Sequence, residues 1–598
     1  MVRHFACPCL VRRPRAGRNG DSPRPARPNR DRVVAWLRDR RQWARGRAVP
    51  RIAALIIAGV FGYLPPATGA TDTLTIGITQ FPSTFHPAIN LMAAKQYILA
   101  MTLRPVTDYG HDWKLRCFLC AELPTIENGL AEPTELADGG TGVAVTYRLH
   151  PDATWGDGTP VTSADVVFTW ETALREGTGF AAREEYARIL KIDVIDAKTF
   201  TLHVDRLTYT YNAFGGAILP AHLEAAPAAE PAEYRNRTLY DTQPTEPGLW
   251  YGPYRITEVV SGSHVVLEPN PTWYGPEPAF GRIVVRVIEN TAALRANLLS
   301  GSIDYVSGQV GFNTDEALAF ERDGEGAFNV SFVPSLVYEH VDFNLDSLYF
   351  GDRRVRQALM YAIDREALVD ALFGGKQQVA HSLMHPLAPG FDPDVRTYAY
   401  DPAHAGQLLD EAGWRPGPDG IRVSAEGERL SFPLMTTAGS RVRELVQQVL
   451  QAQFRDVGVE ALIRNQPARV FFGETVSHRT NPGLNMYAFL STPEGVPVEM
   501  LRSDRIPAED NGFSGQNFPG YRSDRMDELL DTLELELDPG RRDAMWSELQ
   551  RMYAEDLPAM PLYFRVEPYV VPVWLSGIRP TGHQVPATMW IEEWRAVE

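Results

Sequence analysis

The sequence predicts an α/β protein with more than one domain. Strand signals alternate with helix signals along most of the chain, which is typical of α/β lobes and not of an all-helical or all-β body. The chain has 598 residues, of which 44% are hydrophobic. It can therefore bury several cores, and two or three domains are expected. No internal repeat is present in the sequence.

The clearest local signal lies between residues 143 and 174. Apolar and polar residues alternate over 143–149, which predicts a half-buried strand. Residues 155–160 (WGDGTP) predict a turn, because Asp-Gly tolerates positive φ and Pro fixes the chain that leaves it. Thr162 and Asp165 have the spacing of a capping box, so a helix should begin there.

The other elements follow from the same rules. Strands are predicted at 74–78, 200–204, 283–288 and 561–573, with a hairpin at 254–269. Helices are predicted at 292–299, 352–363, 364–374, 442–454, 529–537 and 545–553. Residues 225–247, rich in Ala, Pro, Glu and Thr, are predicted to be a surface connection.

Several sequence blocks occur in the order that one known family uses, across about residues 71–575. The first is the pattern W-x-D-G-x-P-x-T-x-x-D-V, which begins at Trp155. The others are LWYGPYRITEV with NPTWYG, RANLLSGSIDYV, the segment from VDFNLD to DALFGG, TYAYDPAHAGQLLDEAGW, GYRSDRMDELL and AEDLPAMPLYF. Together they resemble the bacterial extracellular solute-binding proteins of family 5, the oligopeptide and dipeptide receptors of ABC importers.

The resemblance implies a two-lobed α/β periplasmic-binding-protein fold, with an extra domain II and a ligand cleft between hinge-linked lobes. Residues 1–70 would form a signal peptide with an over-long basic region. Domain I would be discontinuous, domains II and III continuous, and residues 333–344 a hinge crossing. The expected ranges are 71–112, 245–335 and 561–598 for domain I, 113–244 for domain II and 336–560 for domain III.

The resemblance also implies a function. The chain is expected to be a periplasmic receptor that captures peptides or peptide-like solutes and delivers them to membrane ABC permease subunits with cytoplasmic ATPases. It would work as a monomer without a cofactor. The alternatives are a non-peptide solute such as an opine, a glycoside or a metal chelate, and a sensory receptor that docks to another protein.

The family's ligand-binding acid falls in the stretch 485–494. Peptide-binding members hold the ligand's terminal ammonium with an Asp in a Gly-Trp-x-x-Asp-like segment. Alignment of this segment places Thr492 at the Asp position, and Glu494 is the nearest carboxylate. Either Glu494 substitutes for the Asp through a shifted backbone, or the ligand has no free amino group, because a buried unpaired cation is costly. The ligand-binding residues expected here are Phe489, Leu490, Ser491, Thr492 and Glu494.

Two further places could line the cleft. Leu91, Met92 and Ala93 match the domain I stretch that lines it in the family, and core packing is the alternative for these apolar residues. Tyr338 on the hinge crossing could contact ligand or bridge two lobes. Phe489 could stack on ligand or pack beneath it.

The first 70 residues resemble a secretory signal. They contain fifteen Arg and three acidic residues, then an uncharged run at 52–64 and a small-residue exit at 68–70. The run is shorter than the ~18 residues of a spanning helix, so a membrane anchor is the weaker alternative. We expect the true start to lie nearer Val33 or Val49, which would account for the long basic region, and the mature chain to begin near Thr71. The apolar run is not followed by a Cys, so a lipid anchor is not indicated.

Charge and motifs exclude several function classes. Without residues 1–70 the chain keeps 43 basic and 72 acidic residues, a formal charge of −29, which disfavours nucleic acid as a partner. The sequence contains none of the motifs G-x-S-x-G, H-E-x-x-H, phosphate-binding G-x-x-x-x-G-K-[ST] or dinucleotide G-x-G-x-x-G. No enzyme is therefore predicted; the rival is a secreted peptide hydrolase. His381 and His385 should lie on a loop as solvated or hydrogen-bonding residues and not as metal ligands.

The remaining cysteines form a C-x-x-C pair, Cys117 and Cys120. A small structural disulfide is the first interpretation in an oxidising compartment. Two free thiols or a redox pair are the alternatives.

Overall fold

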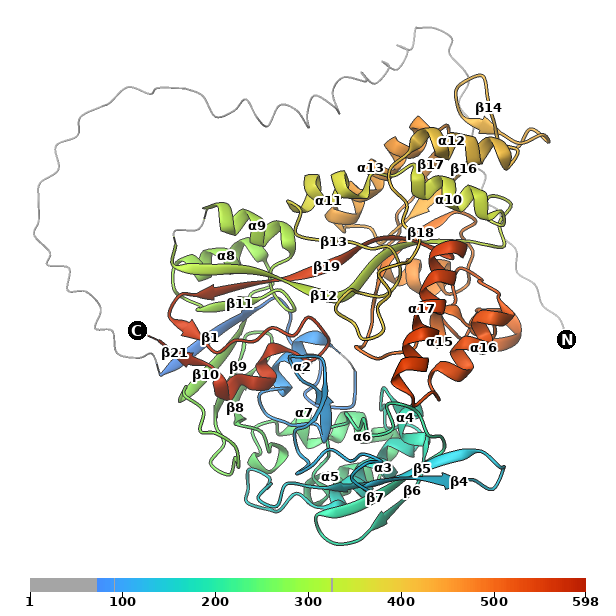
Figure 1. The fold of residues 1–598 in the computed structure, drawn as a ribbon. Coiled ribbons are helices and arrows are strands. Elements are labelled where there is room, and N and C mark those ends of the chain that lie inside the picture. Colours follow the sequence, from blue (N-terminus) through green and yellow to red (C-terminus); the bar gives the residue numbers. More distant parts are fainter. Residues whose placement is uncertain (1–71, 91, 324–325, 598) are drawn as a thin grey trace, which may run out of the picture. The chain divides into compact units, whose positions relative to one another are not determined.

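The computed structural model describes residues 72–90, 92–323 and 326–597, drawn as a ribbon in Figure 1. Among these residues the largest sheet has eleven strands, in the order β17-β16-β18-β12-β19-β11-β1-β10-β9-β8, with β13 paired to β19. Its strands are β1 (Thr73–Ile78), β8 (Tyr254–Val260), β9 (His264–Pro269), β10 (Arg282–Val287), β11 (Tyr305–Ser307), β12 (Phe328–Phe343), β13 (Gln378–Val379), β16 (Ser431–Met435), β17 (Glu460–Ile463), β18 (Leu484–Leu490) and β19 (Ala559–Pro572).

Two long strands run through the middle of this sheet. β12 and β19 pair antiparallel, with register shifts between Pro334 and Tyr338 and between Glu339 and His340. On one side, β1 pairs parallel with β10 and β11, and α8 (Thr291–Leu299) connects the last two. On the other side, β18 pairs antiparallel with β12 and parallel with β16.

Helices cover one face of the β12–β18–β16 region and share a core with it. They are α10 (Arg353–Tyr361), α11 (Arg365–Phe373), α12 (Pro402–Glu411) and α13 (Arg441–Asp456). The caps agree with the predicted helix starts: Asp352 and Asp364 accept hydrogen bonds from the backbone N–H of Arg354 and Ala367. Gly374 ends α11 with φ 59°, a conformation that suits glycine.

A second core joins Tyr338 and β19 to helices near the C-terminus. These are α15 (Val498–Leu501), α16 (Asp524–Leu533) and α17 (Pro539–Asp556). The helix predicted at 529–537 is α16, which begins and ends a few residues before the predicted bounds. Its start is set by Ser523, whose side chain accepts a hydrogen bond from the Met526 N–H.

A separate four-stranded sheet has the order β4-β5-β7-β6. Its strands are β4 (Ala131–Glu135), β5 (Thr141–Arg148), β6 (Ile189–Val194) and β7 (Thr199–Val204). The predicted strand, turn and helix at 143–174 are confirmed, and the Thr162–Asp165 capping box begins α3 (Ser163–Leu174). The side chain of Trp155 in the turn is fully buried and anchors the turn to the core.

The remaining elements are short. The strand pairs are β2 (Thr107–Tyr109) with β3 (Leu115–Cys117), β14 (Arg415–Pro416) with β15 (Arg422–Val423), and β20 (Leu575–Ser576) with β21 (Arg595–Ala596). The other helical segments are α2 (Ala93–Leu99), α4 (Arg183–Ala187), α9 (Thr314–Asp323), α14 (Ala468–Val470), a π-helix at Phe471–Val476, and 3-10 turns at Pro247–Leu249, Ser503–Arg505, Glu509–Asn511 and Ala587–Glu593.

The predicted surface connection at 225–247 is largely exposed, but it is helical and a few of its side chains enter the core. This stretch and the residues just before it form α5 (Ala221–Ala228), α6 (Pro231–Arg237) and α7 (Leu239–Thr242). The side chains of Tyr234 and Tyr240 are fully buried, and the carboxylate of Glu224 accepts the Leu239 N–H at 2.7 Å. Tertiary burial of two aromatic rings therefore outweighs a Pro- and Ala-rich composition.

The predicted domain boundaries at 335/336 and 560/561 fall inside β12 and β19. The four-stranded sheet lies wholly within the predicted domain II range. In the part of the chain that the structure describes, no helix is both long and apolar enough to cross a bilayer.

Candidate ligand-binding site

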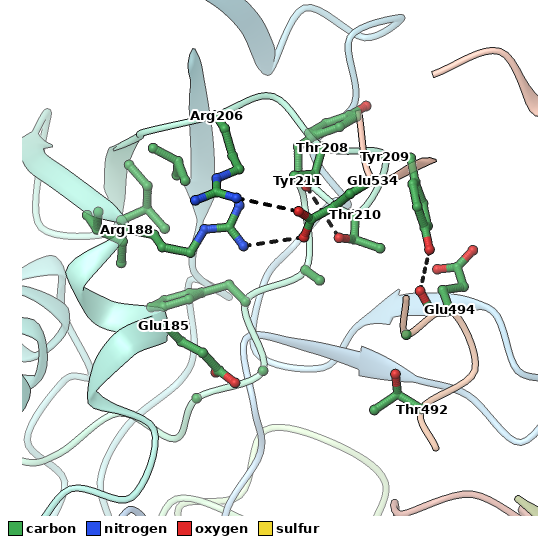
Figure 2. Close-up of a pocket in the computed structure, with 18 of the residues that line it drawn as sticks. Glu185, Arg188, Arg206, Thr208, Tyr209, Thr210, Tyr211, Thr492, Glu494 and Glu534 are labelled. Carbon is green, nitrogen blue, oxygen red and sulfur yellow. Dashed lines mark hydrogen bonds and ion pairs between the residues drawn. The ribbon is translucent and has the colours of Figure 1, made fainter. Parts of the chain in front are cut away.

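A cavity of about 450 Å³ lies where the segment that follows β18 meets the segments around β6 and β7. Its walls come from residues within 185–189, 202–216 and 492–496, with Tyr109, Tyr147 and Glu534. This volume is in the range of small-molecule sites, about 300–1,000 Å³. The close-up in Figure 2 shows the charged side chains Arg188, Arg206 and Glu534 gathered at one end and Glu494 with Tyr209 at the other.

The fold presents Glu494 at the end of a buried strand. β18 is apolar, and Leu484 and Met486 are fully buried between its neighbours. After β18 the Ser491 N–H still donates to the carbonyl of Leu336 at 3.3 Å. Buried Pro493 then follows, and a half-buried Glu494 projects toward the cavity.

Two tyrosines from other segments of the cavity wall donate hydrogen bonds to Glu494. Its Oε2 accepts the hydroxyl of Tyr109 at 3.0 Å, and its backbone carbonyl accepts the hydroxyl of Tyr209. Burial raises the pKa of Glu494, although the Tyr109 hydrogen bond and the charge of Arg542 act in the opposite direction. Among the described residues no basic side chain forms an ion pair with Glu494 within 4 Å. The site thus holds a partly desolvated anion that a ligand cation could neutralise.

A second acidic group, Glu534, sits among arginines. Arg188 and Arg206 approach its two oxygens at 3.6 Å each, as the dashed lines of Figure 2 mark. The Glu534 carbonyl accepts the Tyr209 N–H at 3.0 Å. The guanidinium of Arg542 lies 4.6 Å from the centre of the Tyr209 ring. These guanidiniums are therefore already engaged. Among the described residues, neither Glu185 nor Glu494 of the cavity wall forms an ion pair, and Glu494 is the one that lies in the segment predicted to bind ligand.

Aromatic rings make up much of the remaining wall. The aromatic residues that line the cavity are Tyr109, Tyr147, Tyr186, Tyr209, Tyr211 and Phe214. Such a lining accepts apolar groups and the faces of cations. The cavity combines an acid with an apolar wall, which suits a solute that carries a cationic group on an apolar or peptide-like frame.

Comparison with known proteins places the chain in a family. The model for bacterial extracellular solute-binding proteins, family 5, matches residues 125–495. The chain belongs to this family. It is 27% identical over 470 residues to the oligopeptide-binding protein AppA of Bacillus subtilis, covering 76% of this chain and 81% of that protein. A Brucella ovis relative, named as a candidate ABC transporter peptide-binding protein, is 26% identical and covers 85% of this chain and 90% of the relative.

Solved structures of the family have the same fold. The oligopeptide-binding protein of Thermus thermophilus, complexed with a pentapeptide, is 30% identical with a TM-score of 0.69 and covers 88% of this chain and 96% of that chain. NikZ from Campylobacter jejuni, in complex with Ni(L-His), also has a TM-score of 0.69 at 21% identity, with coverage of 88% and 100%. The chain therefore has the two-lobed α/β fold of family 5 that its sequence blocks predict.

Thr492, which the sequence comparison aligns with the family's Asp, and Glu494, the nearest carboxylate, both line the cavity. Ser491 directly precedes the lining residues, and Phe489, Leu490 and Ser491 are not part of the cavity wall. Phe489 stacks on His340, with ring centres 5.2 Å apart, while Leu490 is 58% exposed.

The other predicted residues lie away from this cavity. Met92 precedes α2, and Ala93 is the first residue of that helix and is exposed. Leu91 lies outside the described residues. Tyr338 is 1% exposed, and its hydroxyl lies 3.1 Å from that of Tyr553 in the core beneath α17.

Apart from Thr492 and Glu494, the residues of the cavity wall were not identified from the sequence. Those with polar contacts at the site include Tyr109, Arg188, Arg206, Tyr209 and Glu534. Each lies in a segment without a family motif, and 385 residues separate Tyr109 from the Glu494 that it contacts. The one local signal is the aromatic-rich run LTYTYNAF at 207–214, which lines the cavity.

The cysteine and histidine pairs lie outside the cavity. Cys117 and Cys120 form a disulfide. His381 and His385 are on a loop, and burial lowers the pKa of each to about 4. Within the described ranges, no three His, Cys, Asp or Glu side chains are arranged to hold a metal ion.

Proposed function

We propose that the protein is the substrate-binding protein of an ABC importer, which captures peptides or peptide-like solutes and delivers them to a membrane permease. The observation that carries this proposal is the half-buried, unpaired Glu494 that faces an aromatic cavity. Family membership and the pentapeptide complex of a 30% identical neighbour support it. Binding across the cavity would favour a closed state in proportion to the ligand's differential affinity for that state.

We propose that Glu494 binds a ligand ammonium. Thr492 at the family's Asp position cannot neutralise a cation, and Glu494 lies beside it on the same wall. The five predicted residues between Phe489 and Glu494 remain our candidates for ligand contact. Thr492 and Glu494 are the first of them to test. Leu91, Met92, Ala93 and Tyr338 stay predictions.

A second ligand class is a metal chelate or another non-peptide solute. The fold itself accommodates such ligands, since the C. jejuni neighbour holds Ni(L-His). The neutral Thr492 at the acid position favours this candidate. It differs from the first in needing no free amino group.

We propose a periplasmic location and a three-domain organisation. Family 5 proteins are extracellular or periplasmic, and residues 1–70, which lie outside the described residues, would be removed so that the mature chain begins near Thr71. Domain I would comprise 71–112, 245–335 and 561–598, domain II 113–244 and domain III 336–560, with β12 and β19 as the crossing strands. We further propose a monomer that associates with the permease subunits and their cytoplasmic ATPases, without a nucleic-acid partner.

The family and the relatives named above are binding proteins. We propose that this chain likewise catalyses no reaction. A sensory role remains the alternative to transport, and genes for two permeases and two ATPases beside this one would favour transport.

Isothermal calorimetry with trialanine and N-acetyltrialanine tests the proposed ligand class. The free-amino peptide should bind at least ~10-fold more tightly, since the lost charge contact is worth more than ~1.4 kcal/mol. Heat from neither peptide, with a Ni(II)–histidine complex binding instead, would move the assignment to the second class.

A further inference from the structure

Tyr109 lines the same cavity as Glu494 and contacts its carboxylate. It is the last residue of β2, which pairs antiparallel with β3. Its side chain is 9% exposed, and its hydroxyl donates to Glu494 Oε2 at 3.0 Å. Burial and the neighbouring Glu494 charge raise the pKa of the Tyr109 hydroxyl, so this group keeps its proton and acts as a donor.

The groups around Glu494 come from several elements. Tyr109 and Asp108 are on β2, Tyr209 follows β7, Glu534 ends α16, and Arg542 is on α17. The other charged groups that line the cavity are Arg188 and Arg206, which pair with Glu534, and Glu185 on α4.

The two tyrosines make different contacts. Tyr209 reaches the backbone carbonyl of Glu494, whereas Tyr109 reaches the carboxylate. Arg542 lies over the Tyr209 ring and forms no ion pair with Glu494 within 4 Å. In the described part of the chain, the Tyr109 hydroxyl is the one hydrogen-bond donor to this carboxylate.

A single hydroxyl donor has two physical consequences here. A hydrogen bond to the charged form favours ionisation, so it opposes the effect of burial on Glu494. It also fixes the carboxyl group in one orientation, with Oε2 engaged and Oε1 left for a second partner. Both consequences matter if Glu494 meets a ligand cation.

We propose that Tyr109 is a positioning residue for ligand recognition: it holds Glu494 as an oriented anion, with Oε1 directed to a ligand cation. The identity of the ligand in this inference rests on the proposed function, whereas the contact between Tyr109 and Glu494 does not. Because Tyr109 and Glu494 belong to the segments assigned to domains I and III, the hydroxyl reaches the carboxylate only where these two segments meet. The proposed binding acid therefore takes its hydrogen-bond donor from a segment that is distant in the sequence.

The test compares Tyr109→Phe with Tyr209→Phe, since each removes one hydroxyl and leaves a ring. Calorimetry with trialanine is run from pH 4.5 to 8. Tyr109→Phe should weaken binding about tenfold at pH 7. It should also move the pH at which binding is lost on acidification upward by about half a unit or more, because the carboxylate loses the donor that favours its charged form.

Tyr209→Phe is the matched control, because its hydroxyl contacts a backbone carbonyl. The pH midpoint of this variant should equal that of the wild type, whatever happens to its affinity. A Tyr109→Phe profile that superimposes on the wild-type profile, or equal shifts in both variants, would overturn the proposal. Circular dichroism melting curves verify that each variant is folded.

A ligand-free measurement separates this inference from the proposed function. The Glu494 carboxyl carbon, assigned by its absence in Glu494→Gln, is titrated by ¹³C NMR in wild type and Tyr109→Phe. An upward shift of its pKa in Tyr109→Phe supports the positioning role even if trialanine does not bind. An unchanged pKa refutes that role, even if the peptide binds well.

Discussion

Glu494→Gln tests the role of the acid with little change in shape. Gln keeps the side-chain length and an oxygen that can accept the Tyr109 hydroxyl, so the contact at 3.0 Å can persist. The variant removes only the negative charge. Ligand-free stability should therefore change little, and the loss should be seen in binding.

The structure sets the expected magnitude. Removing one partner of a desolvated charge pair costs about 2–5 kcal/mol in binding. Glu494 is half-buried and not fully enclosed, so the lower end applies, about 2 kcal/mol or ~30-fold in Kd. Calorimetry with trialanine measures this loss, and N-acetyltrialanine, which has no ammonium, should show almost none.

Thr492→Asp is the complementary change. It places a second carboxylate on the same wall, at the family's acid position, and should strengthen binding of a free-amino peptide. The reasoning would be refuted if Glu494→Gln bound the co-purified solute as tightly as the wild type while tri- and tetrapeptides gave no heat with either protein. The ligand would then be sought among neutral or anionic solutes.

Three further outcomes are expected. Lys95→Met should lower the free energy of unfolding by ~3 kcal/mol in urea titrations, because the buried Nζ donates to the carbonyls of residues 86, 87, 89 and 90. The exposed control Lys114→Met should change it by no more than ~0.5 kcal/mol, and equal effects of the two variants would contradict this prediction. Replacing Cys117 and Cys120 by Ser should leave trialanine affinity unchanged, since a bridge between residues three apart constrains little chain, and lost binding would indicate a functional thiol pair. Glu534→Gln should weaken trialanine binding about two- to threefold at low salt and not at ~1 M NaCl, because the ion pairs of Glu534 with Arg188 and Arg206 are partly exposed and salt screens them. A tenfold loss of affinity that persists at high salt would contradict this prediction.

Helix starts were predictable where the residues of one short segment make the capping contacts among themselves. The capping box at Thr162 and Asp165 and the caps at Asp352 and Asp364 are found as predicted. Those signals need only neighbours in sequence. The helices between residues 221 and 242 could not be predicted in this way, because burial of Tyr234 by distant elements stabilises them.

The site was predictable on one wall only. Thr492 and Glu494 follow from a family motif, and both line the cavity. Tyr109 and Arg188 have no motif, and the fold alone brings them to the acid segment. Tyr338 on β12 is 1% exposed and packs in the core that contains α16 and α17, and its role toward ligand stays a prediction.

The most direct test of the central claim is native mass spectrometry of the protein purified from the periplasm without added ligand. The account predicts one bound solute per chain, with at least one amide bond and a free ammonium group. Glu494→Gln isolated in the same way should retain much less of it. A sugar, an anionic solute or a metal chelate without a free ammonium, retained equally by both proteins, would contradict the account.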